Sequence, residues 1–174
     1  MQKADSRRFK AEKWHPVVKL GRYCSRFTLL LREHEPQLLE QLDILSDFQG
    51  NYQGLLIYMK SARRPELVIL ELVVLESDRA ISLDFCGVRT EFTDQKAALA
   101  MLRAILQDEL LHVAHYVNNK LRESWLAGPE QARMALSENE YVSRGCLDYL
   151  LPGRLTLISV HSWSGKLDQN SRGW

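Results

Sequence analysis

The sequence predicts an α+β fold with a three- to four-stranded antiparallel meander, flanking helices and one long helix at about residues 94–126. Two observations predict this class. Residues 54–92 hold runs of β-branched and aromatic residues separated by turn-like breaks, as antiparallel strands do. On either side of this region, apolar residues recur every three to four positions, which is the spacing of an amphipathic helix. We therefore expect one sheet covered by helices.

The N-terminal half predicts a basic arm, a helix and three strands. Residues 1–28 form the arm, and residues 29–174 form a single α+β domain. The helix at 34–48 has a proline near its start, where a missing N–H costs nothing, and apolar residues at helical spacing. The strands of the meander are then 54–60, 66–76 and 79–92.

The C-terminal half predicts two helices and a last strand. The long helix begins at Thr93 or Asp94, which can cap its N-terminus, and ends before Gly128, a typical helix stop. A shorter helix covers about residues 129–140. A strand at 154–163 precedes a tail that we expect to be frayed.

Composition limits the class of protein. The N-terminus is charged where a secretory signal needs an apolar core, and the sequence has no run of eighteen uncharged apolar residues. We therefore expect a cytoplasmic protein that does not associate with a membrane. The three cysteines lie far apart, which predicts reduced thiols and neither disulfides nor a zinc knuckle. The sequence has no phosphate-binding glycine loop, and we expect no bound cofactor.

Charge is distributed unevenly along the chain. Residues 1–28 hold eight Lys or Arg and two acidic residues, a net charge of +6, so the remaining 146 residues sum to −5. A basic arm can bind nucleic acid, because Lys and Arg displace counterions from phosphates. It can equally fold back on the acidic remainder. Since no zinc finger or RNP-type motif accompanies the charge, nucleic-acid binding is a minor alternative.

The segment DELLHVAHY, residues 108–116, places two carboxylates and two histidines in the predicted long helix. At about 100° per residue, Asp108, His112 and His115 share an arc opposite the apolar line. Zinc accepts imidazole and carboxylate ligands, so this arc is the candidate metal site. It needs a fourth ligand or a water; His161 is the only late histidine, and nothing in the sequence brings it near. The alternatives are an ordinary polar helix face and a face that is covered by the C-terminal region or by a protein partner.

A second candidate site comes from strand register. A tight turn at residues 77–78 pairs residues whose numbers sum to 155, which places Leu72 opposite Leu83 on an apolar face. The same register places Glu71 opposite Asp84 on the other face, where like charges are unfavourable. An arginine bridge, a bound cation or a raised pKa on one member would relieve the pair. With a raised pKa, Glu71 and Asp84 would be the acid and base of a hydrolase.

The last predicted strand ends in HSWSGKLD, where Trp163 is either a core residue or an exposed anchor for a partner. An α+β domain that ends in a strand followed by Ser162, Trp163, Gly165 and Asp168 resembles some small bacterial proteins of the toxin-immunity type. This resemblance implies a cytoplasmic inhibitor that binds a cognate toxin domain and catalyses nothing.

Together these observations predict a non-catalytic intracellular protein-binding module with a protein partner; the resemblance implies that this partner is a toxin domain. The candidate partner-binding residues are Trp163, Asp108, His112 and His115. The alternative is a small hydrolase that depends on a metal or on the carboxylate dyad.

Overall fold

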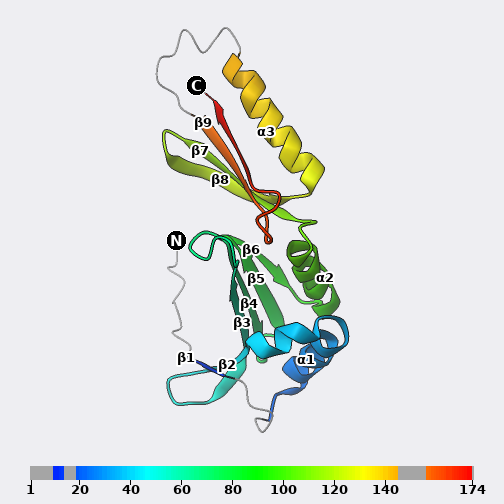
Figure 1. Ribbon diagram of the computed structural model, residues 1–174. Helices are drawn as coiled ribbons and strands as arrows, with labels where there is room; N and C mark the ends of the chain where they lie inside the picture. Colours follow the sequence, from blue (N-terminus) through cyan, green and yellow to red (C-terminus); the bar gives the residue numbers. More distant parts are fainter. Residues whose placement is uncertain (1–9, 14–18, 145–155, 174) are drawn as a thin grey trace. The chain divides into compact units, whose positions relative to one another are not determined.

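The computed structural model describes residues 10–13, 19–144 and 156–173 and confirms the α+β class (Figure 1). The prediction of one three- to four-stranded meander is wrong, because the described strands form a six-stranded sheet A and a four-stranded sheet B. Sheet A contains β1 (Lys10–Lys13), β2 (Leu42–Ser46), β3 (Tyr52–Lys60), β4 (Ile69–Leu75), β5 (Ala80–Phe85) and β6 (Val88–Phe92), in chain order. Sheet B has the order β10 (Gln169–Gly173), β9 (Thr156–His161), β7 (Leu111–Val117) and β8 (Lys120–Ala127). The helices are α1 (Arg22–His34), the 3-10 helix η1 (Pro36–Gln41), α2 (Gln95–Leu106) and α3 (Pro129–Arg144).

The chain divides into two compact units. The first unit holds α1, η1 and most of sheet A. The second unit holds sheet B and α3, together with residues 60–69 and 85–89. Each unit has its own buried apolar residues, and each is described by itself below.

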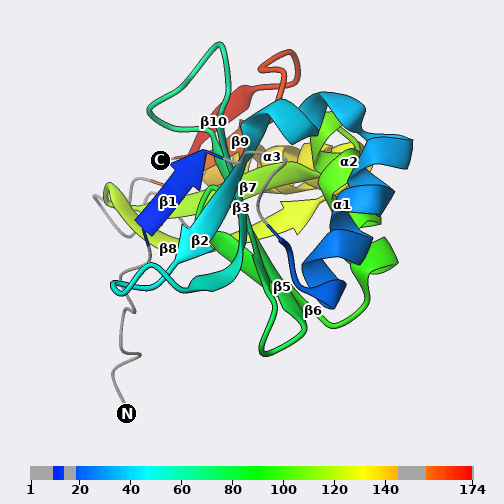
Figure 2. The same ribbon diagram turned by 90° about the horizontal axis from the view of Figure 1, so that it is seen from below.

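The core of the first unit lies between α1 and one face of sheet A (Figure 2). Cys24, Phe27 and Leu31 recur at helical spacing and are fully buried. The Cys24 thiol donates a hydrogen bond to the carbonyl of Val74 in β4 at 3.7 Å, and burial raises the pKa of this thiol to about 12. Cys24 is therefore a protonated packing residue. Among the described residues, Cys24 and Cys86 are not joined in a disulfide.

The N-terminus of α1 is capped by a side chain from another element. Gly21 occupies the N-cap position and offers no side-chain hydrogen bond. The carboxylate of Glu76, directly after β4, instead accepts the backbone N–H groups of Tyr23 and Cys24, each at 2.9 Å. Those N–H groups have no partner within a helix, so the carboxylate satisfies both and also complements the positive end of the helix dipole.

The helix predicted at 34–48 is wrong. Residues Pro36–Gln41 form η1, and Leu42–Ser46 form β2, which pairs with β3. The long first helix is α1, and its first seven residues belong to the segment predicted as a basic arm. Backbone pairing also joins Lys10–Lys13 of that segment to β2 as β1.

The long helix predicted at 94–126 is also wrong. Helix α2 ends at Leu106, and Asp108 follows in the left-handed conformation with φ of 59°. The chain then forms the hairpin β7–β8, whose two-residue turn, Asn118-Asn119, has φ of 52° and 62°. Paired left-handed residues are typical of a type I′ turn, and asparagine tolerates them well. The Asn118-Asn119 pair is the sequence feature that indicates a hairpin here, and the prediction of a long helix overlooked it.

The core of the second unit lies between α3 and one face of sheet B (Figure 1). The helix predicted at 129–140 is present as α3, and the strand predicted at 154–163 is present as β9. The prediction of a frayed tail is wrong, because Gln169–Gly173 pair with β9 as β10. The buried residues of this core are Leu111, Val113, Ala127, Ala132, Leu136, Ile158 and Val160.

Candidate functional site: the β9–β10 loop and the α3 groove

The loop between β9 and β10, residues Ser162–Asp168, is held by its own polar groups. The Asp168 carboxylate accepts hydrogen bonds from the backbone N–H and the hydroxyl of Ser162, at 2.7 and 3.3 Å. The Ser162 hydroxyl in turn accepts a hydrogen bond from the N–H of Leu167 at 3.1 Å. The backbone carbonyl of Ser162 accepts one from the N–H of Gly165 at 3.2 Å. These bonds close the loop at its base, as an Asx-type side-chain interaction does.

Asp108 attaches the middle of the loop to the turn that follows α2. Its carboxylate accepts the backbone N–H of Ser164 at 2.9 Å and also the Ser164 hydroxyl. Hydrogen bonds to an ionised carboxylate are stronger than neutral ones. Asp108 has a left-handed backbone conformation, and in this conformation its carboxylate lies at the loop and accepts the Ser164 bonds.

Residues 61–64 make a third set of bonds to the loop. The Ser61 hydroxyl donates to the carbonyl of Trp163 at 2.9 Å, and Arg63 Nη1 donates to the carbonyl of Gly165 at 3.1 Å. Arg64 Nε lies 3.1 Å from Asp168 Oδ2 in an ion pair. The loop is thus fixed by residues from two other segments of the second unit.

The residues that carry the immunity-type resemblance have structural roles in this loop. Ser162 and Asp168 close its base. Gly165 has φ of +70°, and a Cβ there would lie 2.7 Å from Arg63 Cδ, so a larger residue would strain the backbone and require the Arg63 side chain to move. Trp163 is half-buried, and its carbonyl is the group that Ser61 holds.

The structure separates the three residues of the predicted helix face. Asp108 lies in the turn before β7, whereas His112 and His115 lie on β7 at an odd spacing and so point to opposite faces of sheet B. His115 Nδ1 lies 3.2 Å from Glu123 Oε1 of β8. The prediction that Asp108, His112 and His115 share one helix face is therefore wrong. Among the described residues no group of three or more His, Cys, Asp or Glu could hold a metal ion.

Sheet pairing brings together two histidines that the sequence did not connect. His112 of β7 faces His161 of β9, and their rings stack with centroids 5.8 Å apart and planes 15° apart. Phe85 contacts His112 edge-on, with centroids 6.4 Å apart. His112 is buried and His161 is half-buried. Burial lowers the pKa of His161; nearby Asp168 opposes this shift and Arg64 adds to it.

Glu71 and Asp84 lie on neighbouring strands, β4 and β5. The N–H of Cys86 donates to the carbonyl of Ile69 at 2.9 Å, which fits the predicted register, since these numbers also sum to 155. Leu72 and Leu83 are fully buried, so they lie on the core face as predicted, whereas Glu71 and Asp84 are half-buried on the other face. The proposed acid and base roles of this pair stay a prediction.

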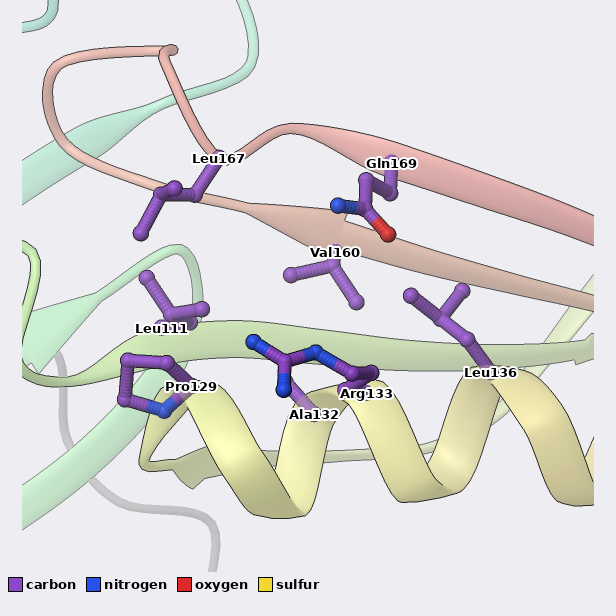
Figure 3. A pocket seen from close by; sticks show the side chains of 8 residues that line it. All are labelled: Leu111, Pro129, Ala132, Arg133, Leu136, Val160, Leu167 and Gln169. Carbon is purple, nitrogen blue, oxygen red and sulfur yellow. The ribbon is translucent and has the colours of Figure 1, made fainter.

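A small groove lies beside the loop, between α3 and sheet B (Figure 3). Its volume is about 50 Å³, well below the ~300–1,000 Å³ of pockets that bind small molecules. Buried apolar side chains line its interior, while Arg133, Leu167 and Gln169 are exposed around it. The lining residues are Leu111, Pro129, Ala132, Arg133, Leu136, Val160, Leu167 and Gln169; we call this set the α3 groove. No sequence pattern predicted the groove, because its residues come from four elements and the loop.

A second exposed apolar feature lies in the first unit, at the tip of the β2–β3 hairpin. Phe48 is 80% exposed there. The Asp47 carboxylate accepts the N–H groups of Gln49 and Asn51, at 2.9 and 2.8 Å, and the Asn51 amide at 3.0 Å. The bonds from Asn51 lower the pKa of Asp47. Phe48 is thus presented on an ordered turn.

Comparisons with known proteins identify no relative: no family model, no curated protein and no solved structure matches the chain. Separately, no helix in the described part of the chain is long and apolar enough to cross a membrane.

Replacing Asp108 should loosen the β9–β10 loop. Asp108→Asn keeps one acceptor oxygen and a residue that tolerates the left-handed conformation, so we expect a loss of about 1 kcal/mol in stability. Asp108→Ala removes both acceptors, and we expect about 2 kcal/mol. Hydrogen exchange of the Ser164 amide, measured by NMR beside urea unfolding, checks this. Equal amide protection in all three proteins would show that Asp108 does not hold the loop.

Proposed function

We propose that the protein is a non-catalytic protein-binding module whose second unit binds a partner through the α3 groove and the β9–β10 loop. One observation carries the proposal: an apolar groove with room for part of one side chain lies directly beside a loop that hydrogen bonds from other segments hold in place. Leu167 belongs to both features. A surface that is ordered before binding loses little conformational entropy when the partner arrives.

The chemistry of the groove indicates what kind of partner segment fits. About 50 Å³ accommodates part of one apolar side chain, and each methylene group buried there contributes about 0.8 kcal/mol. Positively charged side chains lie near the groove: Arg133 lines it, and Arg63 and Lys166 are exposed at the loop. A segment with an aliphatic anchor next to acidic residues is therefore the best match.

A toxin domain is the partner implied by the sequence resemblance, and toxin neutralisation is a narrower form of the same proposal. The motif behind the resemblance has structural roles in the loop, so it does not by itself identify a toxin. The identity of the captured partner decides this narrower form.

Site-specific crosslinking tests the proposal. A photo-crosslinking amino acid replaces Leu167 in one protein and Leu121 in another; Leu121 is 55% exposed on β8, compared with 38% for Leu167. A third protein carries the crosslinker in place of Phe48. Nuclease treatment first removes nucleic acid. We then expect one partner protein to crosslink to the variant with the crosslinker at position 167 and to neither of the other two variants. Equal crosslinking from all three positions, crosslinking only from position 48, or none from 167 would contradict the proposed surface.

With the partner in hand, Leu167→Asp should weaken binding at least tenfold. The substitution removes an apolar contact beside the groove and adds a negative charge that repels an acidic segment. Isothermal titration calorimetry measures the change in Kd. Leu121→Asp is the matched control and should leave the Kd within about twofold, because exposed positions outside an interface contribute little. Equal weakening by both variants would show a general charge effect and no specific use of the groove.

A further inference from the structure

The stacked pair His112–His161 lies at the base of the β9–β10 loop. His161 is the last residue of β9, and Ser162, which closes the loop, follows it directly. His112 faces it from β7, and Phe85 covers His112 edge-on. The rings are nearly parallel, with centroids 5.8 Å apart. The order of the loop therefore depends on how these two strand ends pack.

The surroundings of His161 favour its neutral form. His161 Nδ1 is buried and has no hydrogen-bond partner among the described residues. The charged groups near His161 are Asp168 and Arg64, which are already paired with each other at 3.1 Å. The Asp168 carboxylate also accepts two hydrogen bonds from Ser162. A proton on His161 would thus meet a carboxylate that is fully engaged in holding the loop.

We propose that His112 and His161 form a pH-sensitive switch for the β9–β10 loop: two neutral rings keep the strand ends packed, and protonation releases the loop. Two cations 5.8 Å apart inside the unit would repel each other. A protonated His161 would also compete with Ser162 and Arg64 for Asp168. Low pH would then also weaken binding of the protein partner. This consequence rests on the proposed function, whereas the release of the loop does not.

The direction of the pH dependence follows from burial. Burial lowers the pKa of His161 in the folded protein, while in an unfolded chain histidine titrates near pH ~6.5. The unfolded or opened state therefore takes up the proton first. The stabilisation is fully present above pH ~6.5 and is lost as the pH falls below it, by up to about tenfold in the equilibrium constant per pH unit for each proton excluded.

The test uses the full chain without any partner. NMR hydrogen exchange gives the protection factors of the Ser164 and Leu167 amides at pH 7.5, 6.5 and 5.5, corrected for intrinsic exchange. Because an unfolded histidine is half protonated near pH ~6.5, we expect protection in the wild type to fall about fivefold between the two lower values. His161→Gln removes the titrating ring and should abolish that fall. His115→Gln is the matched control, since His115 lies on β7 with His112 but contacts Glu123 on the other side of the sheet, and it should behave as wild type.

Wild-type pH dependence in His161→Gln, or its loss in His115→Gln, would overturn the switch. If His161→Gln fails to fold, the titration of the His161 ring in the wild type decides by itself. A pKa below 6.5 with a simultaneous change at the Ser164 amide supports the proposal, and a pKa at or above 6.5 rejects it. Because these readouts need no partner, failure of the switch is distinct from failure of the crosslinking at pH 7.5.

Discussion

Replacing Gly54 with alanine should destabilise the first unit by about 3 kcal/mol or more, which is the largest effect we expect from one added methyl group. Gly54 lies in β3, where it pairs with Leu45 of β2. A Cβ at Gly54 would overlap the carbonyl oxygen of Val74 and lie 3.1 Å from its carbonyl carbon. These are backbone atoms of β4 in the same sheet, so no side-chain movement can relieve the clash.

Urea unfolding of the variant measures this effect. Gly50→Ala in the turn of the same hairpin is the control, because a Cβ there meets no atom within 4 Å although its φ is +82°. We expect Gly50→Ala to cost about 1 kcal/mol through backbone conformation alone. If Gly54→Ala is no less stable than Gly50→Ala, then the close approach of β3 to β4 does not constrain position 54.

Removing the Glu76 carboxylate should cost about 2–4 kcal/mol, because Glu76→Ala leaves two N–H groups at the start of α1 without their acceptors. Tyr23 and Cys24 donate those bonds at 2.9 Å, and each bond to a charged group contributes about 1.5–3 kcal/mol before water partly replaces it. The alanine side chain also fails to fill the space beside Gly21, where a Cβ would overlap the Glu76 carboxylate group. Helix content by circular dichroism and urea unfolding report the loss.

Glu76→Gln separates charge from shape, since it keeps one acceptor oxygen in place. We expect about half the effect of Glu76→Ala at pH 7. Burial alone would raise the pKa of Glu76, but the backbone bonds from Cys24 and Tyr23, with a contribution from Arg79, lower it overall. The stabilisation is therefore present above about pH 4.3, the unfolded value, and is lost as the pH falls through the lower folded pKa. A stability gap between wild type and Glu76→Gln that is unchanged from pH 7 to pH 3 would contradict this account.

Part of the candidate site could be predicted from sequence, and the missing part was its geometry. Asp108, Trp163 and the SWSGKLD segment were recognised as unusual, and the loop does connect Asp108 to Ser164. The prediction placed Asp108 on a helix face, because the helical spacing of Leu99, Leu102 and Leu106 in α2 was continued into residues that form strand β7. The valines, the tyrosine and the Asn118-Asn119 pair favour a β-hairpin in this segment. The helical spacing of the leucines favours a helix, and the prediction followed the leucines.

Sequence patterns were enough to predict the α+β class, the register of the β4–β5 hairpin, helix α3 and strand β9. These elements depend on local alternation, on turns and on caps, which are read over a few neighbouring residues. No sequence pattern predicted the second sheet, the carboxylate cap on α1 or the pairing of His112 with His161, which the folded structure shows. Each of these joins residues about 50 positions apart, and a contact over such a separation is set by the packing of whole elements.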